Sequence, residues 1–304
     1  MRRKAGNNHA MIWSFTKMHG AGNDFVVLDG LSQVIDMTPE RARAIAHRHF
    51  GVGCDQILIV DSPTDPDADF RYRIFNSDGT EVEHCGNGAR CFVRFVHQQK
   101  LTARNPVRAE IATGLITLTE LDDGQVQVDM GQTRFDPQAL PFDVSGLATR
   151  QVGTDMQYGL PIDGTNELLW LSVLAISNPH AVTVVDNVQT TDVQTMGPFI
   201  ESHPRFAKRV NAGFMQVIDT HHIRLRVYER GAGETLACGT GACAAVAAGI
   251  RSGLLQTPVT VQTRGGPLTV DFDGQALTMT GPATTVFKGQ LDIDALVHAI
   301  PTFE

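Results

Sequence analysis

Short runs of alternating apolar and polar residues dominate the chain and predict β-strands. A period of two is typical of a strand that buries one face. Asp123-Gly124 and Asp273-Gly274 stand between alternating runs, as hairpin turns do. The predicted strands are residues 25–28, 56–60, 70–75, 115–121, 125–130, 168–176, 223–228, 259–263 and 268–272. The pattern favours an α+β fold in which strands outnumber helices.

Helical patterns are fewer. Thr38-Pro39-Glu40 offers an N-cap and a proline in the first turn, and predicts a helix that runs to about His49. Two further apolar runs, at residues 90–96 and 243–250, each follow a Cys-Gly-x-Gly segment. The second run is small and apolar on every side, which is typical of a helix that is buried all round.

Composition and length indicate a globular protein of two domains. The chain has 304 residues, of which 42% are hydrophobic and 19% charged, so intrinsic disorder is excluded. A single core rarely grows beyond ~250–300 residues, so two domains are expected. Residues 136–146, rich in Pro, Asp and Gly, are the predicted linker, and residues 1–11 are expected to be a disordered leader with Met11 as an alternative start.

Charge and cysteine content narrow the class of partner and compartment. The net charge of −8 argues against a nucleic-acid or anionic-membrane partner. No apolar window has the ~18 residues of a membrane span, and the basic N-terminus lacks the apolar region of a signal peptide. Five cysteines are an odd number and a poor disulfide framework, so a reducing cytoplasm is expected.

An internal repeat gives the strongest signal. The segments 81–89 and 234–242 both read Glu, three residues, then Cys-Gly-x-Gly-Ala, and an apolar helical run follows each. The two halves therefore resemble duplicated units, each with strands around a central helix whose N-terminus carries a cysteine loop. Two such units facing each other would bring Cys85 and Cys238 together.

A cysteine at a helix N-terminus is suited to proton transfer. Unpaired backbone N–H groups and the helix dipole favour the thiolate and also bind a carboxylate. Inversion of a carbon centre needs a base on one face and an acid on the other, and Cys85 and Cys238 could exchange those roles. Cys54, Cys91 and Cys243 lack this context and are interpreted as core residues.

Other cysteine and glycine chemistry fits the sequence less well. The spacings Cys85-x5-Cys91 and Cys238-x4-Cys243 exceed those of structural zinc sites, so no metal is expected. A Cys-x-x-Cys redox motif is absent. Residues 239–244 match the dinucleotide-binding glycine pattern, but the strand before it and the acid after it are missing. No lysine stands in a context that indicates pyridoxal phosphate.

At these residues the chain resembles the diaminopimelate epimerase family. The resemblance runs from about Trp13 to near the C-terminus and leaves out residues 1–11. It is carried by Met18-His19-Gly20-Ala21-Gly22-Asn23-Asp24-Phe25, by residues 75–79 and 85–91, by residues 229–235 and 238–242, and by Gly53-Cys54-Asp55-Gln56, Ser177-Asn178-Pro179-His180 and Arg209-Val210-Asn211-Ala212.

The resemblance implies a fold, a reaction and an assembly. It implies two pseudo-symmetric α+β domains, each a strongly curved, mostly antiparallel sheet or barrel around a central helix, with the active site between them. The first domain would comprise residues 12–135 and a returning segment 284–304, and the second residues 136–283. The implied activity is the conversion of LL-diaminopimelate to the meso form, in lysine and peptidoglycan precursor biosynthesis, by a homodimer without cofactor.

The resemblance also implies a role for individual residues. Cys85 and Cys238 would be the paired acid and base, and His180 and Glu229 would tune their acidity. The implied substrate-binding residues are Asn23, Gln56, Asn76, Gly86, Asn87, Asn178, Asn211, Glu229, Arg230, Gly239 and Thr240. An Arg for the distal carboxylate and a carboxylate for the distal ammonium suit a substrate with two amino-acid ends.

Two alternatives stay open. The first is a proline-type racemase or a related isomerase of the same fold that acts on a smaller substrate. The second is a thiol switch or ligand-binding protein that uses Cys85 and Cys238 as a reversible disulfide.

Overall fold

The chain forms two compact units in a computed structural model that describes residues 11–82, 85–162 and 164–300. Among these residues, unit 1 comprises 11–20, 24–118 and 283–300, and unit 2 comprises 21–23 and 119–282. The chain passes from unit 1 to unit 2 within strand β7 (Gly114–Glu120). The last strand, β19 (Thr284–Asp292), belongs to unit 1, where it pairs antiparallel with β1 (Ile12–Gly20).

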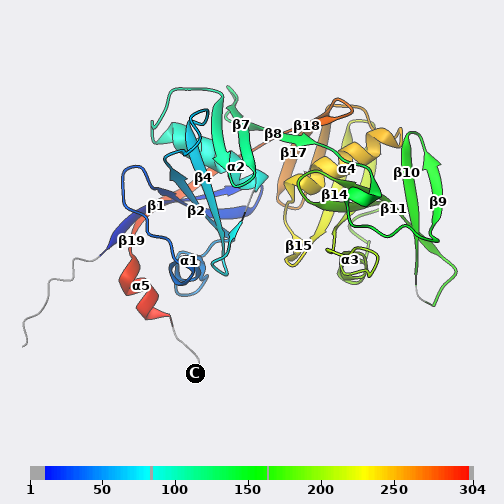
Figure 1. Cartoon of the computed structure of the whole chain (residues 1–304), viewed down its shortest axis with the longest axis horizontal. Coiled ribbons are helices and arrows are strands. Elements are labelled where there is room, and N and C mark those ends of the chain that lie inside the picture. Colours follow the sequence, from blue (N-terminus) through cyan, green and yellow to red (C-terminus); the bar gives the residue numbers. More distant parts are fainter. Residues whose placement is uncertain (1–10, 83–84, 163, 301–304) are drawn as a thin grey trace, which may run out of the picture. The chain divides into compact units, whose positions relative to one another are not determined.

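Unit 1 is a mixed sheet packed against a central helix (Figure 1). Its other strands are β2 (Asn23–Asp29), β3 (Gln56–Asp61), β4 (Phe70–Asn76), β5 (Glu81–Val82) and β6 (Val107–Ile111). The pairs β2–β3 and β4–β6 are parallel, whereas β3–β4, β4–β5 and β6–β7 are antiparallel. Helix α2 (Gly86–Gln98) packs against β1 and β3, while α1 (Pro39–Ala46) packs against α5 (Ile293–Ala299).

Unit 2 surrounds its own central helix, α4 (Gly239–Arg251), with strands (Figure 1). Its strands are β8 (Val126–Gln132), β9 (Ala148–Val152), β10 (Asp155–Pro161), β11 (Leu168–Ala175), β12 (Pro179–Val184), β13 (Asn211–Asp219), β14 (His222–Glu229), β15 (Gly233–Thr235), β16 (Val259–Thr263), β17 (Gly266–Phe272) and β18 (Ala276–Gly281). The pairs β12–β13 and β14–β16 are parallel, and the others are antiparallel.

The two units repeat one order of elements. In unit 1 the parallel pair β2–β3 encloses α1, β3 pairs with β4, and α2 connects β4 and β5 to β6, the parallel neighbour of β4. In unit 2 the parallel pair β12–β13 encloses α3 (Val193–Glu201), β13 pairs with β14, and α4 connects β14 and β15 to β16. The duplication expected from the Cys-Gly-x-Gly repeat is therefore present in the strand order.

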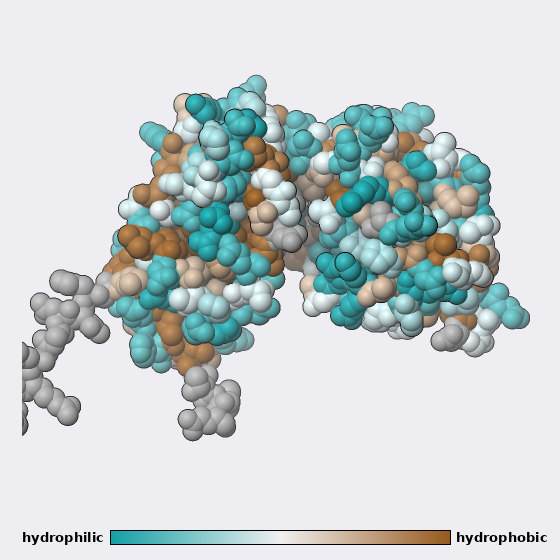
Figure 2. All heavy atoms as spheres, in the orientation of Figure 1, coloured by the Kyte–Doolittle hydropathy of each residue, from teal (hydrophilic) through white to brown (hydrophobic). Residues whose placement is uncertain are grey.

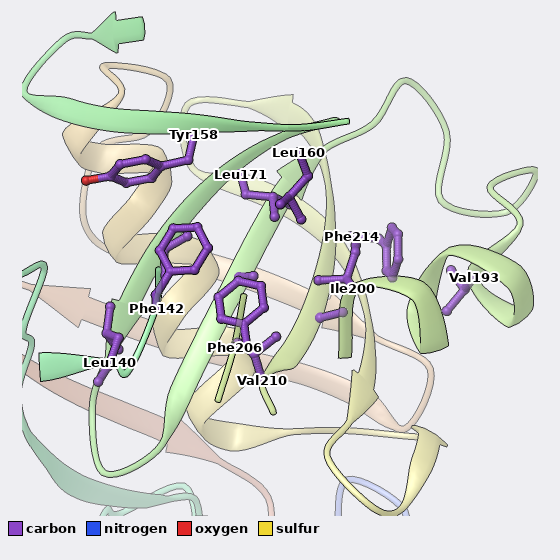
Figure 3. Close-up of a cluster of buried hydrophobic side chains, with 14 residues drawn as sticks. Leu140, Phe142, Tyr158, Leu160, Leu171, Val193, Ile200, Phe206, Val210 and Phe214 are labelled. Atoms are coloured by element: carbon purple, nitrogen blue, oxygen red, sulfur yellow. The ribbon is translucent and has the colours of Figure 1, made fainter. Parts of the chain in front are cut away.

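Unit 2 has a second layer of core between α3 and its sheet (Figure 3). The ring of Phe142 stacks on Phe206 at 4.4 Å between centroids and meets Tyr158 edge-on at 5.3 Å. Leu140 is also buried there. Residues 136–146, predicted as a linker from their Pro, Asp and Gly content, therefore do not form a separate connection, because their two largest apolar side chains enter this core.

The α+β class is confirmed, and each unit has a curved sheet that does not close. The predicted strands coincide with β2, β3, β4, β7, β8, β11, β14, β16 and β17 to within a few residues at each end. Thr38 caps α1 as predicted, but the helix ends at Ala46, before the predicted His49. Contacts place residues 119–135 with unit 2, since β8 pairs with β18, whereas the sequence analysis assigned them to the first domain. The predicted leader, residues 1–11, lies outside the described residues except for Met11.

Candidate active site

In unit 1 the Cys85 loop sits at the N-terminus of the central helix. Cys85 is the N-cap of α2, and its sulfur accepts a hydrogen bond from the Gly88 N–H at 3.4 Å. The hydroxyl of Tyr72, on β4, donates to the Cys85 carbonyl at 3.3 Å. Asn87, in the first turn, is buried. The helix thus begins at a half-buried sulfur that accepts one of its backbone N–H groups.

The second glycine of each Cys-Gly-x-Gly loop is needed because a strand passes close to it. A Cβ on Gly88 would lie 2.2 Å from the Tyr72 hydroxyl oxygen, and one on Gly241 would lie 2.9 Å from a methyl carbon of Val227. The same Cβ on Gly241 would lie 3.3 Å from the sulfur of Cys238. The glycines therefore let each helix start directly against β4 or β14.

In unit 2 the cysteine loop carries an acid. Cys238 is the N-cap of α4 and is buried, and its sulfur lies 3.6 Å from the Thr240 hydroxyl. Glu229, the last residue of β14, places its carboxylate near enough to this sulfur to affect its pKa. The hydroxyl of Thr235 donates to the same carboxylate at 2.5 Å. Glu229 is therefore held by a hydroxyl beside the thiol whose acidity it was expected to tune.

This arrangement keeps the Cys238 thiol protonated. Burial raises the pKa of Cys238 well above its ordinary value, the Glu229 carboxylate raises it further, and Thr240 and the Gly241 N–H oppose the rise. Burial also raises the pKa of Glu229, and the bonds from Thr235 and Cys238 oppose it. The expectation that a helix N-terminus acidifies the thiol is wrong for Cys238, because burial and a neighbouring carboxylate outweigh the helix.

The remaining candidates of unit 2 lie around the ends of β12, β13 and β14. The ring Nε2 of His180 donates to the side-chain oxygen of Asn178 at 2.9 Å. His180 pairs in register with Asn211, whose side-chain oxygen accepts the Arg230 backbone N–H at 2.8 Å. Burial, together with the charge of Arg230, lowers the pKa of His180 to about 3, so this imidazole is neutral at pH 7. The Arg230 guanidinium donates to the Lys208 carbonyl at 3.2 Å.

Unit 1 brings two of its candidate amides together. Gln56 begins β3 and Asn76 ends β4, and the Gln56 amide donates to the Asn76 oxygen at 2.9 Å. The side-chain oxygen Oε1 of Gln56 is buried and has no hydrogen-bond partner among the described residues. Asn23, the first residue of β2, is half-buried and is assigned to unit 2 by its contacts.

Similarity to known families decides the identity of this scaffold. The family model described as Diaminopimelate epimerase matches residues 15–135 and 173–286. The chain belongs to the diaminopimelate epimerase family. Diaminopimelate epimerases of Cupriavidus taiwanensis and Ralstonia pickettii are 64% and 63% identical to it, over 94% and 93% of this chain and 99% and 97% of theirs.

Solved structures of lower identity share the fold of this family member. A hydroxyproline epimerase from Agrobacterium vitis superposes with a TM-score of 0.66 at 16% identity, covering 99% of this chain and 97% of its own. A PhzF-family phenazine biosynthesis protein from Bacillus anthracis gives a TM-score of 0.66 at 14% identity, covering 92% of this chain and 99% of its own. At these identities the likeness concerns the fold alone.

The three remaining cysteines of this epimerase-family chain are core residues, as predicted. Cys54, Cys91 and Cys243 are buried, and burial raises the pKa of Cys54 and Cys91 to about 12. Cys91 and Cys243 lie in α2 and α4 behind the site cysteines, so they provide matched controls for substitutions of Cys85 and Cys238.

Sequence reasoning missed several residues that hold the loops. Thr235, on Glu229, occupies a variable position of the repeat, and Tyr72, on the Cys85 carbonyl, stands outside it. Two arginines, Arg73 and Arg226, each bind the glutamate that opens the repeat. Both arginines stand eight residues before that glutamate, so the repeat continued toward the N-terminus would have revealed them.

Other features of the described residues lie elsewhere. A cavity of about 640 Å³ in unit 1 is lined mainly by β1 and β19, and it contains none of the candidate site residues. Within residues 11–82, 85–162 and 164–300, no group of three or more His, Cys, Asp or Glu is arranged to hold a metal ion. The described helices include none with the length and hydrophobicity to cross a membrane.

Proposed function

We propose that the chain converts LL-2,6-diaminopimelate to meso-diaminopimelate by two-base proton transfer, with Cys85 and Cys238 as the catalytic residues. The observation that carries this proposal is the duplicated unit, in which each copy ends a strand hairpin in a cysteine that caps a buried helix. Two such sulfurs can supply one base and one acid to opposite faces of an α-carbon, as epimerisation requires.

The proposed steps use the residues of each loop. One sulfur, as thiolate, removes the α-proton, and the other, as thiol, delivers a proton to the opposite face, so the pair is left with its protonation exchanged. Backbone N–H groups around Gly86, Asn87, Gly239 and Thr240 bind the carboxylate at the reacting carbon, where negative charge develops. No cofactor takes part in this scheme, because the two sulfurs account for both proton transfers.

Recognition of the distal end is assigned to the other candidates. We place the distal carboxylate on Arg230, whose fork suits bidentate binding, and the distal ammonium on Glu229 and the side-chain oxygens of Asn178 and Asn211. His180, neutral and buried, holds Asn178 through its Nε2–H. The amides of Asn23, Gln56 and Asn76 complete the proposed set of substrate-binding residues.

The proposal extends to assembly and location. We propose a homodimer in the cytoplasm. The dimer is supported by apolar side chains that β1 and β19 leave on the surface of unit 1. Ile12, Val286 and Phe287 are 49%, 56% and 46% exposed. Apolar residues are conspicuous on the face of unit 1 shown in Figure 2, interspersed with hydrophilic ones. Sedimentation of the wild type against Phe287→Asp tests this, and a monomer in both proteins would refute the dimer.

Incubation with LL-diaminopimelate in deuterium oxide tests the reaction. Deuterium at one α-carbon together with meso product, followed by mass spectrometry and chiral separation, is the expected result. Cys85→Ala and Cys238→Ala should each abolish inversion, while Cys91→Ala and Cys243→Ala should retain it. Near wild-type turnover in both Cys85→Ala and Cys238→Ala would refute the two-base scheme.

The same experiment separates the alternatives. Exchange on proline or hydroxyproline, with none on diaminopimelate, would retain the two-thiol chemistry and replace the substrate. No exchange on any amino acid, with Cys85 and Cys238 found as a disulfide that forms and reduces reversibly, would favour a thiol switch.

A further inference from the structure

An arginine–glutamate fork is duplicated in front of the two cysteine loops. In unit 1 the Nε and Nη2 atoms of Arg73 donate to the two carboxylate oxygens of Glu81 at 2.8 and 3.2 Å. In unit 2 the same atoms of Arg226 donate to the two oxygens of Glu234 at 2.6 and 2.9 Å. Each glutamate stands four residues before the site cysteine. The same geometry at the same spacing in both units indicates a shared role.

Each fork joins the two strands of the hairpin that leads into its cysteine loop. Arg226 lies on β14 and Glu234 on β15, and these strands pair with Tyr228 opposite Glu234. The same hairpin presents the Glu229 carboxylate at the end of one strand and the Thr235 hydroxyl at the end of the other. These two groups meet at 2.5 Å, and the carboxylate lies near enough to Cys238 to raise the pKa of its thiol. A shift of the hairpin would therefore separate the acid from the sulfur.

The fork of unit 2 is fixed on every side. The Glu234 side chain is only 4% exposed, and it also accepts from Gln194 at 2.8 Å and pairs with Arg264 at 3.1 Å. The remaining Nη1 of Arg226 donates to the Val188 and Thr191 carbonyls, at 2.8 and 3.2 Å. These bonds tie the hairpin to the segment before α3 and to the turn between β16 and β17. A lysine would retain the charge but could not make this set of parallel bonds.

The fork of unit 1 is the simpler copy. Arg73 also lies 3.4 Å from Asp61 on β3 and above the Phe75 ring, at 5.0 Å from its centroid. The side chain of Glu81 is 45% exposed, so substitutions here disturb the core less than those in unit 2.

We infer that Arg73 with Glu81, and Arg226 with Glu234, are positioning residues that set the Cys85 and Cys238 loops for proton transfer. They do not touch the substrate. In unit 2 the fork acts by holding the Glu229 carboxylate against Cys238. This inference rests on the proposed function only for the identity of the reaction, since the geometry of each loop is a property of its own unit.

Matched Arg→Lys substitutions test the inference. Arg73→Lys and Arg226→Lys remove the forks, and the controls Arg71→Lys and Arg224→Lys make the same change two residues earlier on the same strands. In the epimerisation assay the fork variants should lose about 10- to 100-fold in kcat, the loss that a displacement of ~1 Å produces. KM should stay within about threefold of wild type, and the controls should keep both constants.

Alkylation of each cysteine by iodoacetamide, followed by peptide mass spectrometry, gives a readout that does not depend on substrate. Arg226→Lys should change the rate at Cys238 several-fold and leave Cys85 unchanged, and Arg73→Lys should do the reverse. If Arg226→Lys fails to fold, Glu81→Gln in the exposed fork carries the test at Cys85.

The outcomes separate this inference from the proposed function. Fork variants that match their controls in both kcat and alkylation would overturn the positioning role, whatever the reaction. A rise in KM alone, with kcat unchanged, would also overturn the positioning role. If the wild type does not epimerise diaminopimelate but each fork variant still changes alkylation only at the cysteine of its own unit, the positioning role is upheld and the proposed reaction is refuted.

Discussion

Replacing Glu229 by Gln should make the Cys238 thiol more acidic while it impairs the reaction. Glu229 is the charged group that raises the pKa of Cys238 after burial has done so. Glutamine retains the shape and can still accept from Thr235, but it carries no charge. Its amide can also donate to the sulfur, which favours the thiolate.

The magnitude follows from the charge of the carboxylate near the sulfur. Two unit charges about 4 Å apart repel by about 4 kcal/mol at an effective dielectric constant of ~20. This energy is several times the thermal energy, so removal of the carboxylate should lower the pKa of Cys238 by an amount that a pH profile resolves.

The pH dependence of Cys238 alkylation measures this change. The midpoint of the rate profile, not the absolute rate, reports the pKa, because Cys238 is buried in the wild type as well. Glu167→Gln, the same substitution at an exposed position of unit 2, is the control and should leave the midpoint unchanged. A midpoint for Glu229→Gln that is equal to or above that of wild type would refute the assigned electrostatics.

Three further changes test the scaffold. Lys100 follows α2 with a left-handed φ of 58°, and Gly253 holds the corresponding place after α4 with a φ of 73°. Lys100→Gly should therefore raise the free energy of unfolding in urea by about 1 kcal/mol, and Gly253→Ala should lower it by a comparable amount. Stabilisation by both substitutions would contradict this. Gly88→Ala should lower the free energy of unfolding by about 1–3 kcal/mol, because the added methyl group overpacks against Tyr72. The double variant with Tyr72→Phe should recover part of this loss in thermal unfolding. No recovery would exclude the Tyr72 hydroxyl as the clashing group. The Arg and Lys partners of Asp24 hold the pKa of its carboxyl below the ordinary value despite burial. The stability that this carboxylate gives the folded protein is therefore complete above about pH 4 and is lost as the pH falls below that. Asp24→Asn should lower the free energy of unfolding by about 2–4 kcal/mol at pH 7 and make acid unfolding less steep, and an unchanged acid transition would refute this.

Local sequence pattern predicted nine of the 19 strands that the described residues form, among them β8, β14, β16 and β17, along which burial alternates. β16 was predicted to the residue, and the all-apolar run after Cys238 is the buried helix α4. The predicted helix after Thr38 was three residues too long, since nothing in composition marks where the last turn unwinds. The linker prediction at residues 136–146 failed for a tertiary reason. Turn-forming residues surround Leu140 and Phe142, and only the fold provides the cavity that these side chains fill.

The candidate site was predictable where the chemistry is carried by a motif and not where it depends on register. The cysteines and the glycines beside them are visible in the repeat. The hydroxyl that holds Glu229 comes from Thr235, an ordinary strand residue whose role arises only when β14 and β15 pair. The sign of the pKa shift at Cys238 was also beyond sequence reasoning. The helix terminus predicts a more acidic thiol, whereas burial depth and a carboxylate on another strand decide the opposite.

The two copies of the repeat differ at one position close to the site cysteines, where unit 2 has a glutamate and unit 1 an asparagine. Glu229 stands nine residues before Cys238, and Asn76 stands nine residues before Cys85, each at the end of the corresponding strand. Asn76 accepts from Gln56, and its amide adds no charge to unit 1, whereas the Glu229 carboxylate raises the pKa of Cys238. Inversion by two sulfurs needs one thiol and one thiolate at the start of each turnover. The carboxylate at the one substituted position favours the proton on Cys238, so the proposed starting state has Cys238 as the thiol and Cys85 as the base.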